Sequence, residues 1–141
     1  EARYPQAAAR ENQAIATVLA FFDAMNYQID TGSTDHFNGI VSSYCAKCAQ
    51  VVAETRSLQT NGNHIQGGHF HVISVDSVYP TDAALISVLV TAREDAGEQL
   101  DVSGNILRYF QQIPPTQVGL SVNIETQHAI IQHFYYIGRS S

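Results

Sequence analysis

The chain has 141 residues, of which 45% are hydrophobic and 14% are charged, and its formal net charge is −6. This length suits one domain that buries about two-thirds of the surface of its unfolded chain. The acidic balance and the scattered basic residues argue against nucleic acid or an anionic membrane surface as a partner. No stretch approaches the roughly 20 apolar residues of a membrane span. We expect a single domain at residues 9–138, between a linker at 1–8 and a tail at 139–141.

The first part of the chain predicts three helices. Apolar residues recur at three- and four-residue spacing from Gln6 onwards, and Gly32 is a natural stop because glycine readily adopts the left-handed conformation. A shorter helix fits residues 34–43, and a third fits residues 45–60. The apolar stripe of the long first helix consists of Ile15, Val18, Phe22, Met25 and Ile29.

After Gly67-Gly68 the pattern changes to short segments rich in Val, Ile, Phe and Tyr, which is typical of strands. Pro114-Pro115 is expected to interrupt one such run, and a turn is expected at 126–128. Both faces of the last segment are apolar, so we expect it to be a central strand that is covered on both sides. The predicted strands are 69–79, 84–93, 100–102, 106–113, 117–125 and 129–137.

This order of elements predicts an α+β fold. Three N-terminal helices, one of them long, would pack on a curved antiparallel sheet of four to six strands. A long first helix that crosses a curved sheet gives such a domain the shape of a cone.

The only two cysteines, Cys45 and Cys48, stand between the second and third predicted helices. A redox motif needs a thiolate of lowered pKa, usually at the start of a helix that follows a strand, whereas the segment before Cys45 has a helical pattern. A metal site needs a second ligand pair. The context favours a structural disulfide that fixes the corner between two helices, with a redox centre and half a metal site as alternatives.

The histidines are the next candidates for chemistry. His69 and His71 are two residues apart on a predicted strand, which places both imidazoles on one face. Together with His133 on the last strand, they are candidate zinc or copper ligands. The favoured interpretation is that His69 and His71 face solvent and that the protein holds neither metal nor cofactor.

Asp76 and Tyr27 are the candidate catalytic residues. An Asp in an apolar cavity can have a raised pKa and act as a general base, and a Tyr hydroxyl can stabilise an oxyanion. The favoured alternative is an exposed Asp76 and a packed Tyr27 in a protein without catalytic activity.

Several short motifs resemble, in their order and spacing, a family of actinobacterial exported lipoproteins of unknown function. That family is expected to have the cystatin-like α+β cone of the superfamily named for nuclear transport factor two. The resemblance covers residues 14–137, although the family's last strand usually carries a Trp, which this chain lacks. The motifs are Asn26-Tyr27, Thr31-Gly32-Ser33-Thr34, Cys45-x-x-Cys48, Ile65-Gln66-Gly67-Gly68 and Asp101-x-Ser103-Gly104.

The resemblance implies an extracytoplasmic domain, lipid-anchored to the plasma membrane by a leader that precedes Glu1. The leading hypothesis is therefore a non-catalytic cell-envelope domain that acts as a binding or accessory subunit of a membrane protein complex. One alternative is a small-molecule pocket inside the cone, with possible isomerase-type acid–base chemistry. A second alternative is a thiol–disulfide redox protein that uses Cys45 and Cys48.

Overall fold

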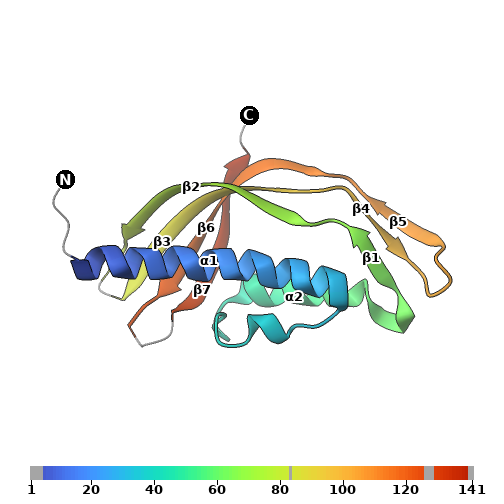
Figure 1. Cartoon of the computed structure of the whole chain (residues 1–141), viewed down its shortest axis with the longest axis horizontal. Coiled ribbons are helices and arrows are strands. Elements are labelled where there is room, and N and C mark those ends of the chain that lie inside the picture. Colours follow the sequence, from blue (N-terminus) through green and yellow to red (C-terminus); the bar gives the residue numbers. More distant parts are fainter. Residues whose placement is uncertain (1–4, 83, 126–128, 140–141) are drawn as a thin grey trace.

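A long helix lies along the inner side of a strongly curved antiparallel sheet (Figure 1). The structure is a computed structural model that describes residues 5–139 except 83 and 126–128, so the turn predicted at 126–128 lies outside the described residues. The helical elements are α1 (Pro5–Thr31), the 3-10 helices at Asp35–Phe37 and Thr60–Gly62, and α2 (Ala46–Ser57). The strands are β1 (His64–Gly67), β2 (Phe70–Pro80), β3 (Leu85–Glu94), β4 (Gly97–Leu100), β5 (Ile106–Phe110), β6 (Ile113–Asn123) and β7 (Ile130–Arg139).

The first predicted helix is confirmed as α1, and its apolar stripe faces the core. Val18, Phe22 and Met25 are all buried, with exposed fractions of 0%, 4% and 3%. The helix ends at Gly32, which has φ +79° and donates its backbone N–H to the Gln28 carbonyl at 2.7 Å. A glycine therefore ends this helix as its sequence position indicates. No helix among the described residues has the length and apolar character needed to cross a membrane.

The helix predicted at 34–43 is wrong. Only a 3-10 turn at Asp35–Phe37 forms there, and Gly39 then turns the chain with φ +83°. The chain next runs beside β7, where Ser42 donates to the Ile131 carbonyl and Ile131 donates to the Ile40 carbonyl, both at 2.8 Å. Backbone pairing with the edge of the sheet thus replaces the local helical pattern. The described residues contain two α-helices, α1 and α2, rather than three.

The strands form two antiparallel sheets rather than one sheet of four to six strands. The larger sheet has the order β2-β3-β6-β7, and the smaller has the order β1-β4-β5. The prediction missed β1 and placed the start of β4 in a loop, because four-residue strands carry almost no alternating pattern. The smaller sheet forms an arm that continues from the larger one (Figure 1).

Two details of the larger sheet also correct the prediction. Strand β6 continues through Pro114-Pro115, which lie at a register shift between Ala92 and Glu94 of β3. A proline at a bulge removes no ladder hydrogen bond, so the strand is not interrupted there. The last strand, β7, has one neighbouring strand, β6, and only a single bridge from Val41 to Ile131 on its other side, so it is an edge strand and not a central one. Its apolar residues Tyr136 and Ile137 are exposed rather than covered.

The core lies between α1 and the inner face of the larger sheet. Phe21 of α1 is fully buried and contacts Phe37 and Phe134 edge-on, with ring centroids 5.7 and 5.6 Å apart. Such edge-to-face pairs add to the burial of apolar surface. The 3-10 turn, α1 and β7 therefore meet at one aromatic cluster, opposite the buried side chains of β3 and β6.

Three glycines allow the backbone of β1 to pass close to β4. Gly67 and Gly68 have φ +75° and +76°, and Gly68 donates its N–H to the Ala96 carbonyl at 3.1 Å. A Cβ atom at Gly97 would lie 2.8 Å from the Gly68 nitrogen and 3.0 Å from the Gln66 oxygen. Since these neighbours are backbone atoms, they cannot move away cheaply. The arm therefore depends on glycine at this crossing.

We expect Gly97→Ala to lower the free energy of unfolding by about 1–3 kcal/mol, because the added methyl overpacks a backbone crossing. Urea denaturation followed by circular dichroism measures the change. Ser103→Ala, on the exposed hairpin that follows β4, is the matched control and should change stability by less than about 0.5 kcal/mol. Equal stabilities for the two variants would contradict the close approach described here.

Candidate functional site

A cavity of about 550 Å³ lies between the two helices and the inner face of the larger sheet. It is lined by residues of α1, α2, β2, β3, β6 and β7, so most of the fold contributes to it. Its polar side chains include Glu54 and Thr55 of α2, Glu94 at the end of β3, and Tyr136 of β7. Its apolar wall includes Phe22, Val51, Leu58, Phe70, Val118 and Phe134. A largely apolar cavity with a few polar groups is typical of a small-molecule site.

A second cavity of about 430 Å³ adjoins the first and extends toward β1 and β5. Tyr109 and Phe110 of β5 contribute to its lining. Both cavities include the same Glu94, which therefore stands where they meet. The residues shared by the two linings are Thr55, Leu58, Phe70, Glu94 and Ile113.

Glu94 is the titratable group that the cavity perturbs most clearly. Its burial, together with the neighbouring charge of Asp95, raises the pKa of its carboxyl from 4.5 to about 7. Tyr136 shows the same environment, since burial and then the charges of Glu94 and Glu54 raise the pKa of its phenol. A low-dielectric, acidic surrounding disfavours additional negative charge. Glu94 is not among the site residues predicted from the sequence.

The alternation of residues along β3 places Glu94 on the inner face of the sheet. Ile86, Val88, Val90 and Ala92 alternate along β3 and are buried, with exposed fractions of 4%, 0%, 0% and 8%. The next residue of that parity is Glu94, which belongs to the same inner face. An acidic residue that continues a buried stripe is thus recognisable from the pattern once the strand is known.

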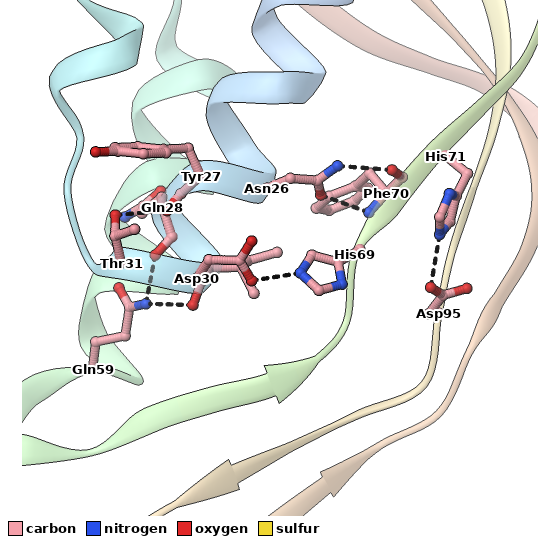
Figure 2. A network of polar contacts seen from close by, with 11 residues as sticks. Asn26, Tyr27, Gln28, Asp30, Thr31, Gln59, His69, Phe70, His71 and Asp95 are labelled. Carbon is pink, nitrogen blue, oxygen red and sulfur yellow. Dashed lines mark hydrogen bonds and ion pairs between the residues drawn. The ribbon is translucent and has the colours of Figure 1, made fainter.

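A polar network fixes α1 to the start of β2 and so positions the cavity wall (Figure 2). Asn26 donates its side-chain N–H to the Phe70 carbonyl at 2.9 Å, and its Oδ1 accepts from the Phe70 N–H at 2.8 Å. This pair of bonds satisfies both backbone groups of Phe70 at the point where the strand leaves the helix. The Phe70 ring lies against Phe22, with centroids 6.2 Å apart.

The end of α2 is tied to the same helix. Gln59 donates its side-chain amide to the carbonyls of Gln28 and Ile29 at 2.7 and 3.3 Å. Buried Gln28 in turn donates to the Val52 carbonyl at 3.0 Å. The distance between α1 and α2, and with it the width of the cavity, is set by these side-chain amides.

The candidate metal ligands lie apart. His69 Nε2 is 2.6 Å from Asp30 Oδ1, and His71 Nε2 is 2.7 Å from Asp95 Oδ2 (Figure 2). His133 is exposed on β7, where it pairs with Ser121 of β6. Within the described residues, no group of three His, Cys, Asp or Glu side chains could hold a metal ion.

The structure also separates the candidate catalytic residues. Asp76 is exposed and accepts hydrogen bonds from Gln117, Ser74 and Thr91 at 3.0, 2.5 and 2.5 Å, which lower the pKa of its carboxyl. Tyr27 stacks on His36 with ring centroids 3.5 Å apart. Neither Asp76 nor Tyr27 lines the cavity described above.

Cys45 and Cys48 lie at disulfide-bonding distance, with their sulfur atoms 2.02 Å apart. Both residues are buried, with exposed fractions of 1% and 0%. Cys45 is the N-cap of α2, and its sulfur accepts the Cys48 N–H at 3.2 Å. The pair therefore fixes the start of the helix that carries Glu54 and Thr55 into the cavity.

Residues 4–105 match the model of a family of unknown function, DUF6318. The chain belongs to this family. None of the curated proteins matches the chain's sequence.

Two solved structures share the fold of this DUF6318 member. The intermembrane-space region of the chloroplast protein ARC6 matches with a TM-score of 0.63 and 12% identity, covering 91% of this chain and 96% of that one. A nuclear transport factor 2 (NTF2-like) superfamily protein from Salmonella enterica subsp. enterica serovar Typhimurium str. LT2 matches with a TM-score of 0.59 and 9% identity, covering 96% and 94%. The expected NTF2-like fold is thereby supported, while the similarity carries no information on ligands.

The raised pKa of Glu94 predicts a pH-dependent stability. Between 4.5 and about 7 the folded state binds more protons than the unfolded chain, so the contribution of Glu94 to stability falls as pH rises through this window. We expect Glu94→Gln to be more stable than the wild type by about 1–2 kcal/mol at about pH 8, after allowance for solvent screening, and to match it near pH 4.

Urea denaturation of both proteins across this pH range tests the expectation. Glu125→Gln, which changes an exposed carboxylate outside the cavity, is the control and should follow the wild type at every pH. The lowered pKa values of Asp76 and Asp101 affect all three proteins alike. Asp95 interacts with the charge of Glu94, but its own lowered pKa places its titration below the window from 4.5 to about 7. A constant difference between Glu94→Gln and the wild type would contradict the assigned titration.

Proposed function

We propose that this DUF6318 domain is a non-catalytic, extracytoplasmic binding domain whose inner cavity takes a small, largely apolar molecule. The observation that supports this most is the cavity of about 550 Å³ with aromatic walls and a half-buried carboxyl, Glu94. Apolar walls supply the free energy of binding and a small number of polar groups supply orientation. The adjoining cavity of about 430 Å³ allows a longer molecule to extend past Glu94.

Binding is favoured over isomerase-type catalysis. A general base must be held at a fixed geometry to a second polar group that acts on the same substrate. Among the described residues, none holds the Glu94 carboxyl by a hydrogen bond, and Asp76 and Tyr27 do not line the cavity. Glu94 therefore fits the orientation of a ligand better than proton transfer.

The cysteine pair supports the extracytoplasmic location and disfavours the redox alternative. A disulfide persists in oxidising compartments and is rare in the cytosol. Exchange requires that an attacking thiolate reaches one of the sulfurs, and both cysteines are buried. The similar fold of the ARC6 intermembrane-space region is consistent with such a location. The lipid anchor stays a prediction from the sequence resemblance.

The binding proposal is tested with the neutral fluorescent probe N-phenyl-1-naphthylamine. Thr55 projects from α2 into both cavities, so Thr55→Trp should fill the space and weaken probe binding by about tenfold or more. Ala53→Trp is the matched control, because Ala53 is exposed on the same helix and lines neither cavity.

Fluorescence titration gives the affinities, and circular dichroism verifies that both variants fold. Wild-type protein that does not bind the probe, or equal affinities for the two variants, would count against a binding cavity.

A second candidate function, docking of a protein partner, is favoured by the free edge of β5. This strand ends the order β1-β4-β5, and its Leu107 and Tyr109 side chains are 52% and 72% exposed. Its only charged side chain is Arg108, so the edge has little protection against pairing with another strand. A partner at the membrane that contributes an extended apolar segment would fit, by addition of a strand.

A photo-cross-linking amino acid in place of Tyr109 tests this docking in native membranes. One reproducible cross-linked protein is expected, and the additional change Leu107→Lys should abolish it by removing apolar contact at the edge. The same cross-linker in place of exposed Tyr44, far from β5 in the chain, is the control. Cross-linked products that are the same at both positions would contradict docking at β5.

A further inference from the structure

The walls of the larger cavity combine aromatic rings with negative charge. Phe22 of α1, Phe70 of β2, and Phe134 and Tyr136 of β7 line the same space as Glu54 and Glu94. Aromatic faces attract cations through their quadrupole, and carboxylates attract them directly. This pairing of features is independent of the cavity's size and shape.

The basic side chains nearest the cavity do not cancel its negative charge. The lining includes one of them, Arg93, whose guanidinium donates to the Asp95 carboxylate and is neutralised there. Lys47 lies outside this lining, and its ammonium sits 5.0 Å from the centroid of the Tyr136 ring. The contact shows that this aromatic ring accepts a cation within the fold itself. Two carboxylates are left facing the cavity.

We infer, on the basis of the proposed binding function, that the cavity selects an organic cation, an amine or quaternary ammonium group on an apolar body. The apolar body would fill the space between Phe22, Phe70 and Phe134, which lies beneath α1. The cationic group would lie at Glu94, where the two cavities meet, with Glu54 at the exposed side. Anions of the same shape would be repelled by both carboxylates.

Because Glu94 titrates near neutral pH, the affinity of the cavity for a cation should depend on pH. A cation binds the ionised carboxylate, so binding releases the proton that Glu94 holds below its pKa of about 7. The charged or titratable groups around it are Asp95 and Arg93 on its own segment, Glu54 on α2, Tyr136 on β7 and Tyr109 on β5. The pKa of Glu94 itself is about 7, close to neutrality. The ionised fraction therefore rises about tenfold between about pH 6 and pH 8, and cation affinity should rise with it.

The experiment uses three molecules with the same alkyl chain: octyltrimethylammonium, octanol and octanoate, each titrated by calorimetry below its aggregation concentration. At about pH 8 we expect the wild type to bind the cation about tenfold more tightly than octanol, and octanoate most weakly. Lowering the pH to about 6 should weaken cation binding by up to about tenfold and leave octanol binding unchanged.

Glu94→Gln keeps the shape of the side chain and removes its charge. It should reduce the preference for the cation over octanol to less than about threefold and abolish the pH dependence of that preference. Glu125→Gln, at an exposed position outside the cavity, should behave as the wild type. The pH series on the wild type tests the inference independently of how well the variant folds.

The outcomes separate this inference from the proposed function. Octanol and cation affinities that are equal in the wild type, or a preference that Glu94→Gln leaves intact, would overturn the cation selectivity while the binding cavity stands. If none of the three molecules binds and N-phenyl-1-naphthylamine does not bind either, both the cavity function and its selectivity are overturned.

Discussion

The arrangement of this domain depends on one interaction, the pair of hydrogen bonds between the Asn26 side chain and the backbone of Phe70. It joins the long helix to the first strand of the larger sheet across 44 residues of sequence. Each bond contributes about 1 kcal/mol, and leaving either backbone group unpaired in this half-buried position would cost more. With Phe70 held in place, its ring meets Phe22 and forms the cavity wall on the side of α1. The amides of Gln28 and Gln59 then set the position of α2, so the cavity is bounded by polar anchors rather than by apolar packing alone.

The parts of the fold that the sequence could predict are those in which one periodic pattern decides the structure. The stripe along α1 and its stop at Gly32 are local features, and α2 follows the same logic. The segment at 34–43 also has a helical pattern, but Gly39 turns the chain and its backbone pairs with Ile131 far away in sequence. A tertiary contact of this kind leaves no periodic signal. The apolar residues on both faces of β7 likewise indicated a strand buried on both sides. Instead, β7 lies at the edge of the sheet, where Tyr136 lines the cavity.

Prediction of the candidate site was also limited by tertiary contacts that the sequence does not reveal. His69, His71 and Asp76 were selected because their residue types carry chemistry, yet each has a partner that accounts for it: Asp30, Asp95, and the donors around Asp76. Glu94 was not selected, although its parity with the buried residues of β3 places it on the inner face. The difference is one of context rather than residue type. Which face of a strand is covered becomes known only when the helix that covers it has been placed.

The position of Glu94 is the strongest physical argument that the cavity serves a purpose. A domain that required only stability would continue the stripe of Val88, Val90 and Ala92 with another apolar residue, since ionisation of a half-buried carboxyl opposes folding. The same cost is reduced when a cation enters, because the carboxylate then regains in the complex what it lost by desolvation. Binding and stability are thus linked through one side chain. The ligand-free domain is least stable at a pH where the carboxyl of Glu94 is ionised. The ionised form is also the one that a bound cation stabilises most.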